Sequence, residues 1–155
     1  ALELITRGHR LIADDAPRFA RIAPDALEGT CPELLRDFLE VRGLGILNIR
    51  AMFGEGAVVR SKTLNLIIDL QPLDQSQLAC IDRLTGSLTA TNILDVTVPK
   101  ILMPVAPGRN LAILVEAAVR HQILRIRGYD ASDDFTNRQA RAIHIDRPDP
   151  PMAPR

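Results

Sequence analysis

The sequence contains no tryptophan, one tyrosine and four phenylalanines, so aromatic residues make up only 3% of its 155 residues. This scarcity argues against single-stranded nucleic acid binding, in which bases stack on aromatic side chains. Nineteen basic and nineteen acidic residues give a formal net charge of zero. The surplus of positive charge that attracts nucleic acids or acidic membranes is therefore absent, and we expect a soluble globular protein without such partners.

Cysteine is also scarce, because Cys31 and Cys80 are the only two in the sequence. Two cysteines are too few for a disulfide framework, and these two lack the spacing of metal ligands. No apolar run approaches the roughly 18–20 residues of a membrane span, and no signal-peptide pattern is present. We therefore expect two free thiols and a cytoplasmic location.

The two ends of the chain differ from its middle. The chain opens directly on ALELITRG, in which apolar residues at helical spacing run into a glycine, without an initiator methionine or an N-cap. We expect a fragment that begins inside a helix of a longer protein. The other end, DRPDPPMAPR, is rich in proline and predicts disorder. We expect one domain over residues 1–144 and a disordered tail over 145–155.

Hydrophobic patterning predicts an alternation of strands and helices. We expect strands at residues 9–15, 18–24, 46–49 and 63–70. Pro99 and Pro104 interrupt the alternation over 92–105, which indicates either an edge strand or a strand–turn–strand unit there. Helices are expected at 32–43, 108–128 and 132–143, and turns at 25–30 and 51–58. This pattern predicts an α/β fold, and most of the strands are too apolar for a sheet with one solvated face.

Asp14 and Asp15 stand at the carboxyl end of the strand predicted over residues 9–15. Open α/β sheets place ligand-handling groups at such ends. Adjacent side chains of a strand point to opposite faces, so one aspartate could hold Mg²⁺ while the other meets a substrate proton. A surface turn with a capping aspartate is the alternative.

Residues 39–49 read LEVRGLGILNI, with one acid, one base and two glycines among apolar residues. Glu40 offers the hard oxygen ligands that suit Mg²⁺, and Arg42 could bind a phosphate or a carboxylate. Gly43 and Gly45 would let the backbone approach a ligand. A helix that ends at a glycine cap explains these residues of the segment 39–49 equally well.

Residues 104–110 read PVAPGRN and lead into a predicted helix. Backbone amides at a helix start bind anions, and Arg109 would add a positive charge there. An ordinary proline-started helix is the alternative.

Arg83 lies in the polar segment DRLTG, which could be a simple loop. None of the three histidines has a serine, cysteine or second histidine at a useful spacing, which argues against a hydrolase triad or zinc site.

Taken together, the sequence resembles the catalytic domain of HPr kinase/phosphorylase from residue 1 to about residue 141. The resemblance rests on LELITRGHRLIADD, LEVRGLGILNI, FGEGAV, VPKILMPVAPGRNLA and RGYDASDDF, which occur in this order. That bacterial enzyme phosphorylates a serine of HPr, the phosphocarrier of the sugar phosphotransferase system, and dephosphorylates it by phosphorolysis. The resemblance implies an α/β, P-loop kinase-like (PEP-carboxykinase-like) fold with a central sheet flanked by helices, C-terminal helices and hexameric assembly.

The resemblance also implies roles for particular residues. Asp15 would be the general base, with Asp14 in support, and Arg83 the catalytic arginine. Glu40 would bind Mg²⁺ within a signature segment formed by Leu39, Glu40, Val41, Arg42, Gly43, Leu44, Gly45, Ile46, Leu47 and Asn48. The dephosphorylation loop would consist of Pro104, Val105, Ala106, Pro107, Gly108 and Arg109. The helix from about Ser132 resembles the one that helps to dock HPr.

One expected motif is missing from the resemblance. The family carries a loop of the form G-x-x-x-x-G-K-[ST] for the phosphates of ATP just before its first helix, and this chain begins about one turn after it. We therefore expect impaired binding of ATP, or of pyrophosphate as an alternative donor. The alternatives are a non-catalytic remnant that binds HPr or self-associates, and a different P-loop or PEP-carboxykinase-like kinase of small molecules.

Overall fold

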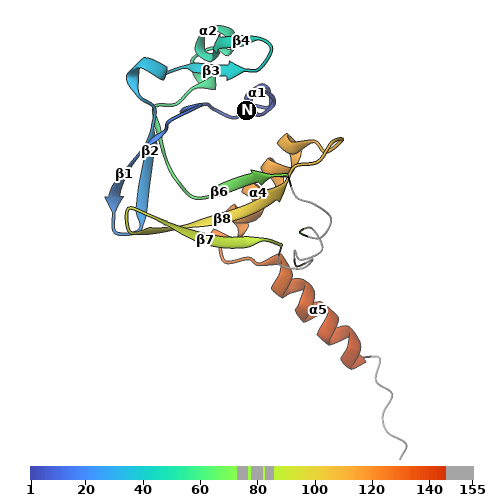
Figure 1. Ribbon diagram of the computed structural model, residues 1–155. Helices are drawn as coiled ribbons and strands as arrows, with labels where there is room; N and C mark the ends of the chain where they lie inside the picture. Colours follow the sequence, from blue (N-terminus) through green and yellow to red (C-terminus); the bar gives the residue numbers. More distant parts are fainter. Residues whose placement is uncertain (73–76, 78–81, 83–85, 146–155) are drawn as a thin grey trace, which may run out of the picture.

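The computed structural model of the chain describes residues 1–72, 77, 82 and 86–145. The described strands form three small sheets, two with three strands and one with two. Figure 1 shows the two-stranded sheet at one end of the molecule, the other sheets in the middle, and a long helix that projects from the opposite end. Within the described residues, no helix is long and apolar enough to cross a membrane.

The first sheet is antiparallel and has the order β1 (Arg18–Ala23), β2 (Ala26–Thr30) and β5 (Ser61–Thr63). The strand predicted at 18–24 is confirmed, whereas the turn predicted at 25–30 is wrong. Two residues, Pro24 and Asp25, suffice for the turn. The following residues alternate in burial around Leu27, which is fully buried, because a strand turns successive side chains to opposite faces.

The second sheet is an antiparallel hairpin of β3 (Phe38–Val41) and β4 (Gly45–Asn48). The helix predicted over 32–43 is wrong, and only the 3-10 turn η1 (Glu33–Leu35) forms there. Asp37 adopts a φ of +69°, which no right-handed helix can accommodate. From Phe38 onward, side chains alternate between the two faces of the hairpin.

The hairpin leads directly into two short helical elements, α2 (Ile49–Phe53) and the 3-10 turn η2 (Glu55–Ala57). The turn expected over 51–58 is therefore largely helical. At the beginning of the chain, α1 (Leu2–Thr6) confirms the helix expected there. The strand predicted at 9–15 is wrong, because only Leu11 pairs, through an isolated bridge to Val58, and the chain bends from Ile12 onward.

The third sheet has the order β6 (Ile67–Gln71), β8 (Val96–Pro104) and β7 (Leu88–Ile93). β6 runs parallel to β8, and β7 runs antiparallel to it. The strand–turn–strand unit expected over 92–105 is confirmed in its turn and second strand, because β8 follows a turn at Leu94 and Asp95, whereas β7 begins already at Leu88. The alternative of an edge strand is wrong, because β8 lies between β6 and β7. The strand predicted at 63–70 is divided, because residue 63 ends β5 and β6 begins only at Ile67.

Two clusters of buried side chains hold these sheets together. One contains Ile5, Leu11, Leu39, Ile49 and Ala57, and it fastens α1 and α2 to the inner face of the β3–β4 hairpin. The other joins Leu27 of β2 to Val96 and Val98 of β8. Burial of each large aliphatic side chain contributes about 1.5–3 kcal/mol. The first cluster therefore anchors the inner face of the hairpin.

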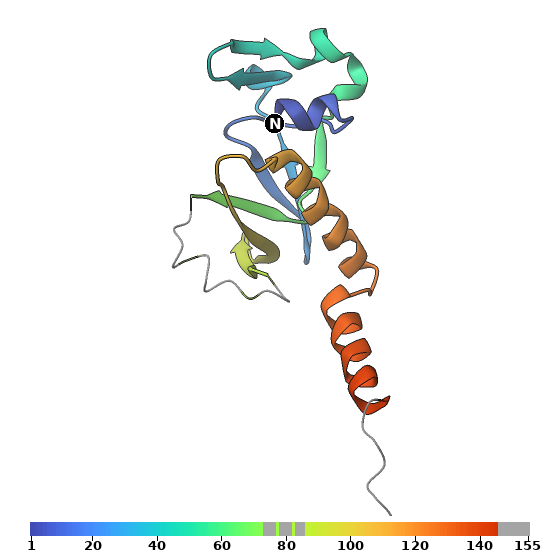
Figure 2. The ribbon, with the colours of Figure 1, turned by 90° about the vertical axis from the view of Figure 1, so that its right-hand side faces the viewer.

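The C-terminal third consists of α4 (Leu111–Ile126) and α5 (Ala131–Ile145), which follow one another along the length of the molecule (Figure 2). The Asn110 side chain caps α4 by accepting a hydrogen bond from the backbone N–H of Ile113 at 3.1 Å. Both helices predicted from the sequence are thus confirmed. The disorder predicted over 145–155 lies outside the described residues, except at residue 145, which ends α5. Cys80 also lies outside the described residues. Cys31 is buried and forms no disulfide.

Candidate active site

The β3–β4 hairpin presents two chemically different faces. On the inner face, Leu39 is 2% exposed and packs in the first core cluster. On the outer face, Glu40 lies directly opposite Ile46 across the two strands, and both side chains are exposed. The alternation of a strand thus explains why charged and apolar residues are mixed in the segment 39–49.

The outer face of the hairpin forms one wall of a small open pocket of about 120 Å³. Asp14, Asp15 and Glu40 line this pocket together with three apolar residues, Leu35, Phe38 and Ile46. The backbone N–H of Glu40 donates a hydrogen bond to Oδ2 of Asp14 at 2.8 Å. The structure therefore brings Glu40 together with Asp14 and Asp15, which precede it by 26 and 25 positions in the sequence. We call this pocket the acidic pocket.

The carboxylate oxygens of the acidic pocket are of the type that binds hard cations. Within the described residues, no group of three or more histidine, cysteine, aspartate or glutamate side chains is arranged to hold a metal ion by itself. Mg²⁺ retains several waters and is commonly bound through one or two carboxylates together with the phosphates of a substrate. Glu40, Asp14 and Asp15 supply carboxylates of this kind in the pocket.

The glycines of the signature segment shape the hairpin turn. Gly43 and Gly45 have φ values of +92° and +86°, and the N–H of Leu44 bonds to the carbonyl of Val41 at 2.9 Å. The alternative of a glycine-capped helix end is therefore wrong. Arg42 lies exposed in this turn. At the other end of the segment, Asn48 caps α2 by accepting a hydrogen bond from the N–H of Ala51.

The segment from Pro104 to Arg109 lies at the carboxyl end of β8. Its backbone is tied to β6 by a 2.8 Å hydrogen bond from the N–H of Val105 to the carbonyl of Gln71. None of its six residues, all of which the structure describes, lines the acidic pocket. The next residue, Asn110, donates a hydrogen bond to the Glu3 carboxylate of α1 at 2.9 Å. This segment therefore lies next to α1. Arg83, the predicted catalytic arginine, lies outside the described residues.

A second contact between α1 and α4 centres on the Glu116 carboxylate. Nε of Arg7 donates to its Oε2 atom at 2.9 Å, and Nε2 of His9 lies 2.7 Å from its Oε1 atom. These hydrogen bonds, first that of Arg7 and then that of His9, lower the pKa of Glu116 to about 2. The strand prediction for His9 missed this contact, because the partner lies more than a hundred residues away.

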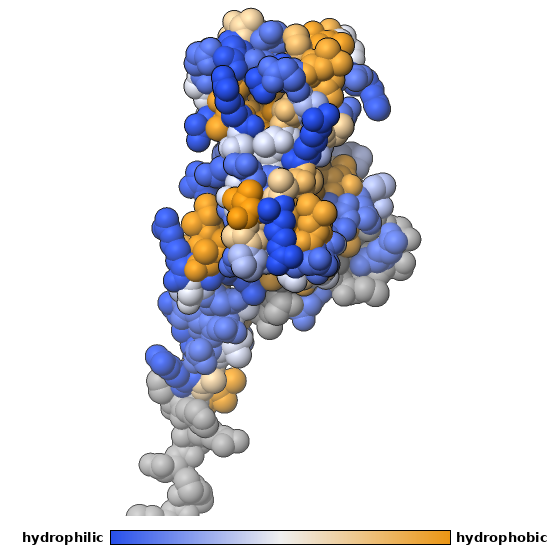
Figure 3. Space-filling model, turned by 90° about the vertical axis from the view of Figure 1, so that its left-hand side faces the viewer, coloured by the Kyte–Doolittle hydropathy of each residue, from blue (hydrophilic) through white to orange (hydrophobic). Residues whose placement is uncertain are grey.

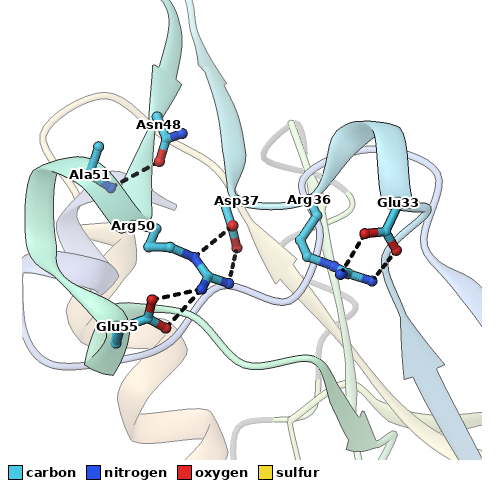
Figure 4. A network of polar contacts seen from close by, with 7 residues as sticks. All are labelled: Glu33, Arg36, Asp37, Asn48, Arg50, Ala51 and Glu55. Carbon is cyan, nitrogen blue, oxygen red and sulfur yellow. Dashed lines mark hydrogen bonds and ion pairs between the residues drawn. The ribbon is translucent and has the colours of Figure 1, made fainter.

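Sequence reasoning also missed an ion-pair network at the open end of the hairpin (Figure 4). Arg50 donates to Asp37 through Nε at 2.7 Å and through Nη2 at 3.2 Å. Its Nη1 atom donates to both carboxylate oxygens of Glu55 at 2.7 and 2.8 Å. The bonds to Asp37 and then to Glu55 raise the pKa of Arg50. No local pattern in the sequence indicates these contacts, because Asp37 and Arg50 lie 13 positions apart.

Comparison with known proteins gives consistent results. The profile of the HPr serine kinase C-terminal domain family matches residues 1–139. Proteins named HPr kinase/phosphorylase from Xanthomonas campestris and Xanthomonas oryzae are each 54% identical over 144 residues, which is 92% of this chain and 46% of theirs. The chain thus spans about half the length of these curated relatives.

A solved structure supports the same relationship. The HPr(Ser) kinase/phosphatase of Coxiella burnetii has 37% sequence identity and a TM-score of 0.72, over 86% of this chain and 80% of that one. The expected α/β, P-loop kinase-like fold with C-terminal helices is thereby confirmed.

Proposed function

The chain belongs to the family of HPr serine kinase C-terminal domains, and from this premise we propose that residues 1–144 form the catalytic domain of a bifunctional, Mg²⁺-dependent kinase/phosphorylase. The substrate is a serine of the phosphocarrier HPr, and the donor is ATP or pyrophosphate. The observation that carries the proposal is the meeting of Asp14, Asp15 and Glu40 in one pocket. Phosphoryl transfer requires such an arrangement of a base and metal-binding oxygens beside the acceptor hydroxyl.

In the forward reaction, the carboxylate of Asp15 takes the proton of the serine hydroxyl while the serine oxygen forms a bond to the γ-phosphorus. The bond between that phosphorus and the leaving oxygen of the donor breaks. In phosphorolysis, orthophosphate attacks the phosphoserine phosphorus, and Asp15 returns the proton to the departing serine oxygen, so that pyrophosphate forms. Mg²⁺ bound at Glu40 would neutralise charge on the phosphates. Asp14 supports Glu40 through the backbone hydrogen bond described above.

Two other elements complete this proposal. The segment Pro104–Arg109 serves dephosphorylation, and the hydrogen bond between Asn110 and Glu3 supports a position near the phosphates, since in the family the phosphate loop directly precedes the first helix. Arg83 acts as a cation on the transferred phosphoryl group. Assembly into a hexamer in the cytoplasm, with a role in the sugar phosphotransferase system and carbon metabolism, belongs to the same proposal.

The second candidate is a self-associating or HPr-binding module without catalysis. Its supporting observation is α4, an apolar helix in which only Ala112 and Gln122 are buried. Ile113, Ile123 and Ile126 are among its exposed side chains, and exposed apolar surfaces of this kind mark contacts with a partner. On the face drawn in Figure 3, apolar side chains also gather near the hairpin end and over the middle of the molecule.

A chimaera tests catalysis directly. The preceding part of the Xanthomonas campestris relative is joined to Ala1, and transfer of labelled phosphate from ATP to HPr is measured, as is phosphate-dependent dephosphorylation. We expect transfer by the chimaera and its loss in Asp15→Asn and in Glu40→Ala, while Asp25→Asn, a change in an exposed turn, retains it. Undiminished transfer by Asp15→Asn would overturn the base assignment. Binding of HPr without transfer by the unmutated chimaera would favour the second candidate.

A further inference from the structure

We infer that Arg50 is a positioning residue, which together with Asp37 and Glu55 fixes the open end of the β3–β4 hairpin and thereby holds Glu40 against Asp14. The inference rests on the proposed function insofar as Glu40 is the metal-binding residue. The network itself is observed independently of that role.

The hairpin needs such a tether because it is a sheet of only two strands, and isolated hairpins are at best marginally stable in water. Leu39 anchors its inner face in the core. The outer face, which carries Glu40, is exposed. The orientation of that face therefore depends on what fixes the two chain segments at the open end.

At the open end, side-chain and backbone bonds act together. Phe38 and Asn48 form the last strand pair, and one residue beyond them the N–H of Ile49 donates to the carbonyl of Asp37 at 2.8 Å. The Asp37 carboxylate, at this open end of the hairpin, accepts hydrogen bonds from two nitrogens of Arg50. A two-pronged contact of this kind fixes orientation as well as distance. It thus sets the angle at which β3 begins.

The backbone conformation of Asp37 is a second reason for a tether. Its φ of +69° lies in the left-handed region, which aspartate adopts more readily than most residues but still at a cost in free energy that the surroundings must offset. Arg50 supplies this constraint, and its remaining nitrogen is bound to Glu55 of η2. The residue that precedes β3, helix α2 and the turn η2 are thereby linked around one guanidinium group, and Asp37 lies three positions before Glu40.

Arg50→Lys tests the inference in the full chain, because lysine keeps the charge but cannot form the two-pronged contact. The matched control is Arg36→Lys. Arg36 pairs with Glu33 within its own turn (Figure 4), and Glu33 is 82% exposed in its side chain. Amide hydrogen exchange is followed at Glu40 and, as an internal reference, at Val98 in the second core cluster. Mn²⁺, a paramagnetic substitute for Mg²⁺, is then titrated while the amide signals of residues 14, 15 and 40 are observed.

We expect the Glu40 amide to exchange about tenfold faster in Arg50→Lys, since local opening becomes easier, while Val98 stays protected. Mn²⁺ broadening should require several-fold more metal in this variant, and Arg36→Lys should match the parent chain in both measurements. Unchanged Glu40 exchange in Arg50→Lys overturns the inference, as does equal loss of protection at Glu40 and Val98, which indicates general destabilisation. If Glu40 exchange rises but Mn²⁺ broadens no variant, the positioning role stands and the metal site of the proposed function fails.

Discussion

The backbone N–H of Glu40 donates a hydrogen bond to Oδ2 of Asp14 across 26 positions of sequence, at 2.8 Å. This bond joins the bend after Leu11 to the outer face of the hairpin. It also explains how two aspartates outside any strand come to share a pocket with a strand glutamate. The pocket therefore depends on a backbone donor as well as on its carboxylates.

Replacement of Asp14 should loosen this junction. Asp14→Ala removes the acceptor and should cost about 0.5–1.5 kcal/mol of unfolding free energy, whereas Asp14→Asn keeps a side-chain oxygen and should cost less. Urea unfolding at neutral pH measures both changes, and Asp25→Ala in an exposed turn is the control. If Asp14→Ala unfolds at the same urea concentration as Asp25→Ala, the bond does not stabilise the fold.

Truncation of a side chain should lower the free energy of unfolding on the inner face of the hairpin but barely change it on the outer face. Leu39→Ala empties a position that is 2% exposed and should destabilise the chain by about 2–5 kcal/mol. Ile46→Ala changes a side chain that is 73% exposed and should stay within about 0.5 kcal/mol. Thermal or urea unfolding compares the two variants. A large loss of stability in Ile46→Ala would mean that the outer face is covered by part of the chain.

The sequence predicted the α/β class, both C-terminal helices and β8, because their hydrophobic periodicity is a local signal. The first four residues of β7 were not predicted as a strand. The region from Pro32 to Asn48 was predicted less well. Leu34, Leu35 and Phe38 match helical spacing, but Asp37 has a φ of +69°, and its carboxylate pairs with Arg50, 13 residues away. Such a partner leaves no trace in a local pattern. Tertiary contacts thus decided between helix and strand.

The candidate site also combines features that the sequence predicted with features that depend on tertiary contacts. The motifs of the family resemblance pointed to Asp14, Asp15 and Glu40, and the structure places them together. From the residues alone, a surface turn was the favoured interpretation of the two aspartates, and a capped helix end explained Glu40 as well as a site did. The apolar lining by Leu35 and Phe38 could not be foreseen, because it depends on the strand register. The roles of the site residues remain predictions for the chimaera experiment.

Acid should weaken the contact between α1 and α4. The pKa of Glu116 is lowered from 4.5 to about 2 in the folded chain, so the charged carboxylate stabilises folding above pH 4.5. That stabilisation is lost as the pH falls towards 2, because the unfolded chain binds the proton first. The urea midpoints of the parent chain and of Glu116→Gln should therefore differ at pH 7 and converge between about pH 4.5 and 2. Glu33→Gln, in an exposed pair, should follow the parent curve; a constant difference for Glu116→Gln across this range would contradict the assignment.

The β7–β8 turn contains two residues in a conformation that suits glycine or asparagine. Leu94 and Asp95 have φ values of +49° and +61° between the paired residues Ile93 and Val96, which is the backbone of a type I′ hairpin turn. Asn-Gly is the preferred sequence there, so the double change Leu94→Asn, Asp95→Gly should raise the unfolding free energy by about 1 kcal/mol.

Gly43→Ala in the β3–β4 hairpin tests the opposite change, from glycine to a residue with a side chain. Its φ is +92° and an added Cβ would meet no atom within 4 Å, so any loss, about 1 kcal/mol by the same reasoning, reflects backbone conformation alone. If both variants shifted the urea midpoint in the same direction, positive φ would not be the controlling factor in these turns.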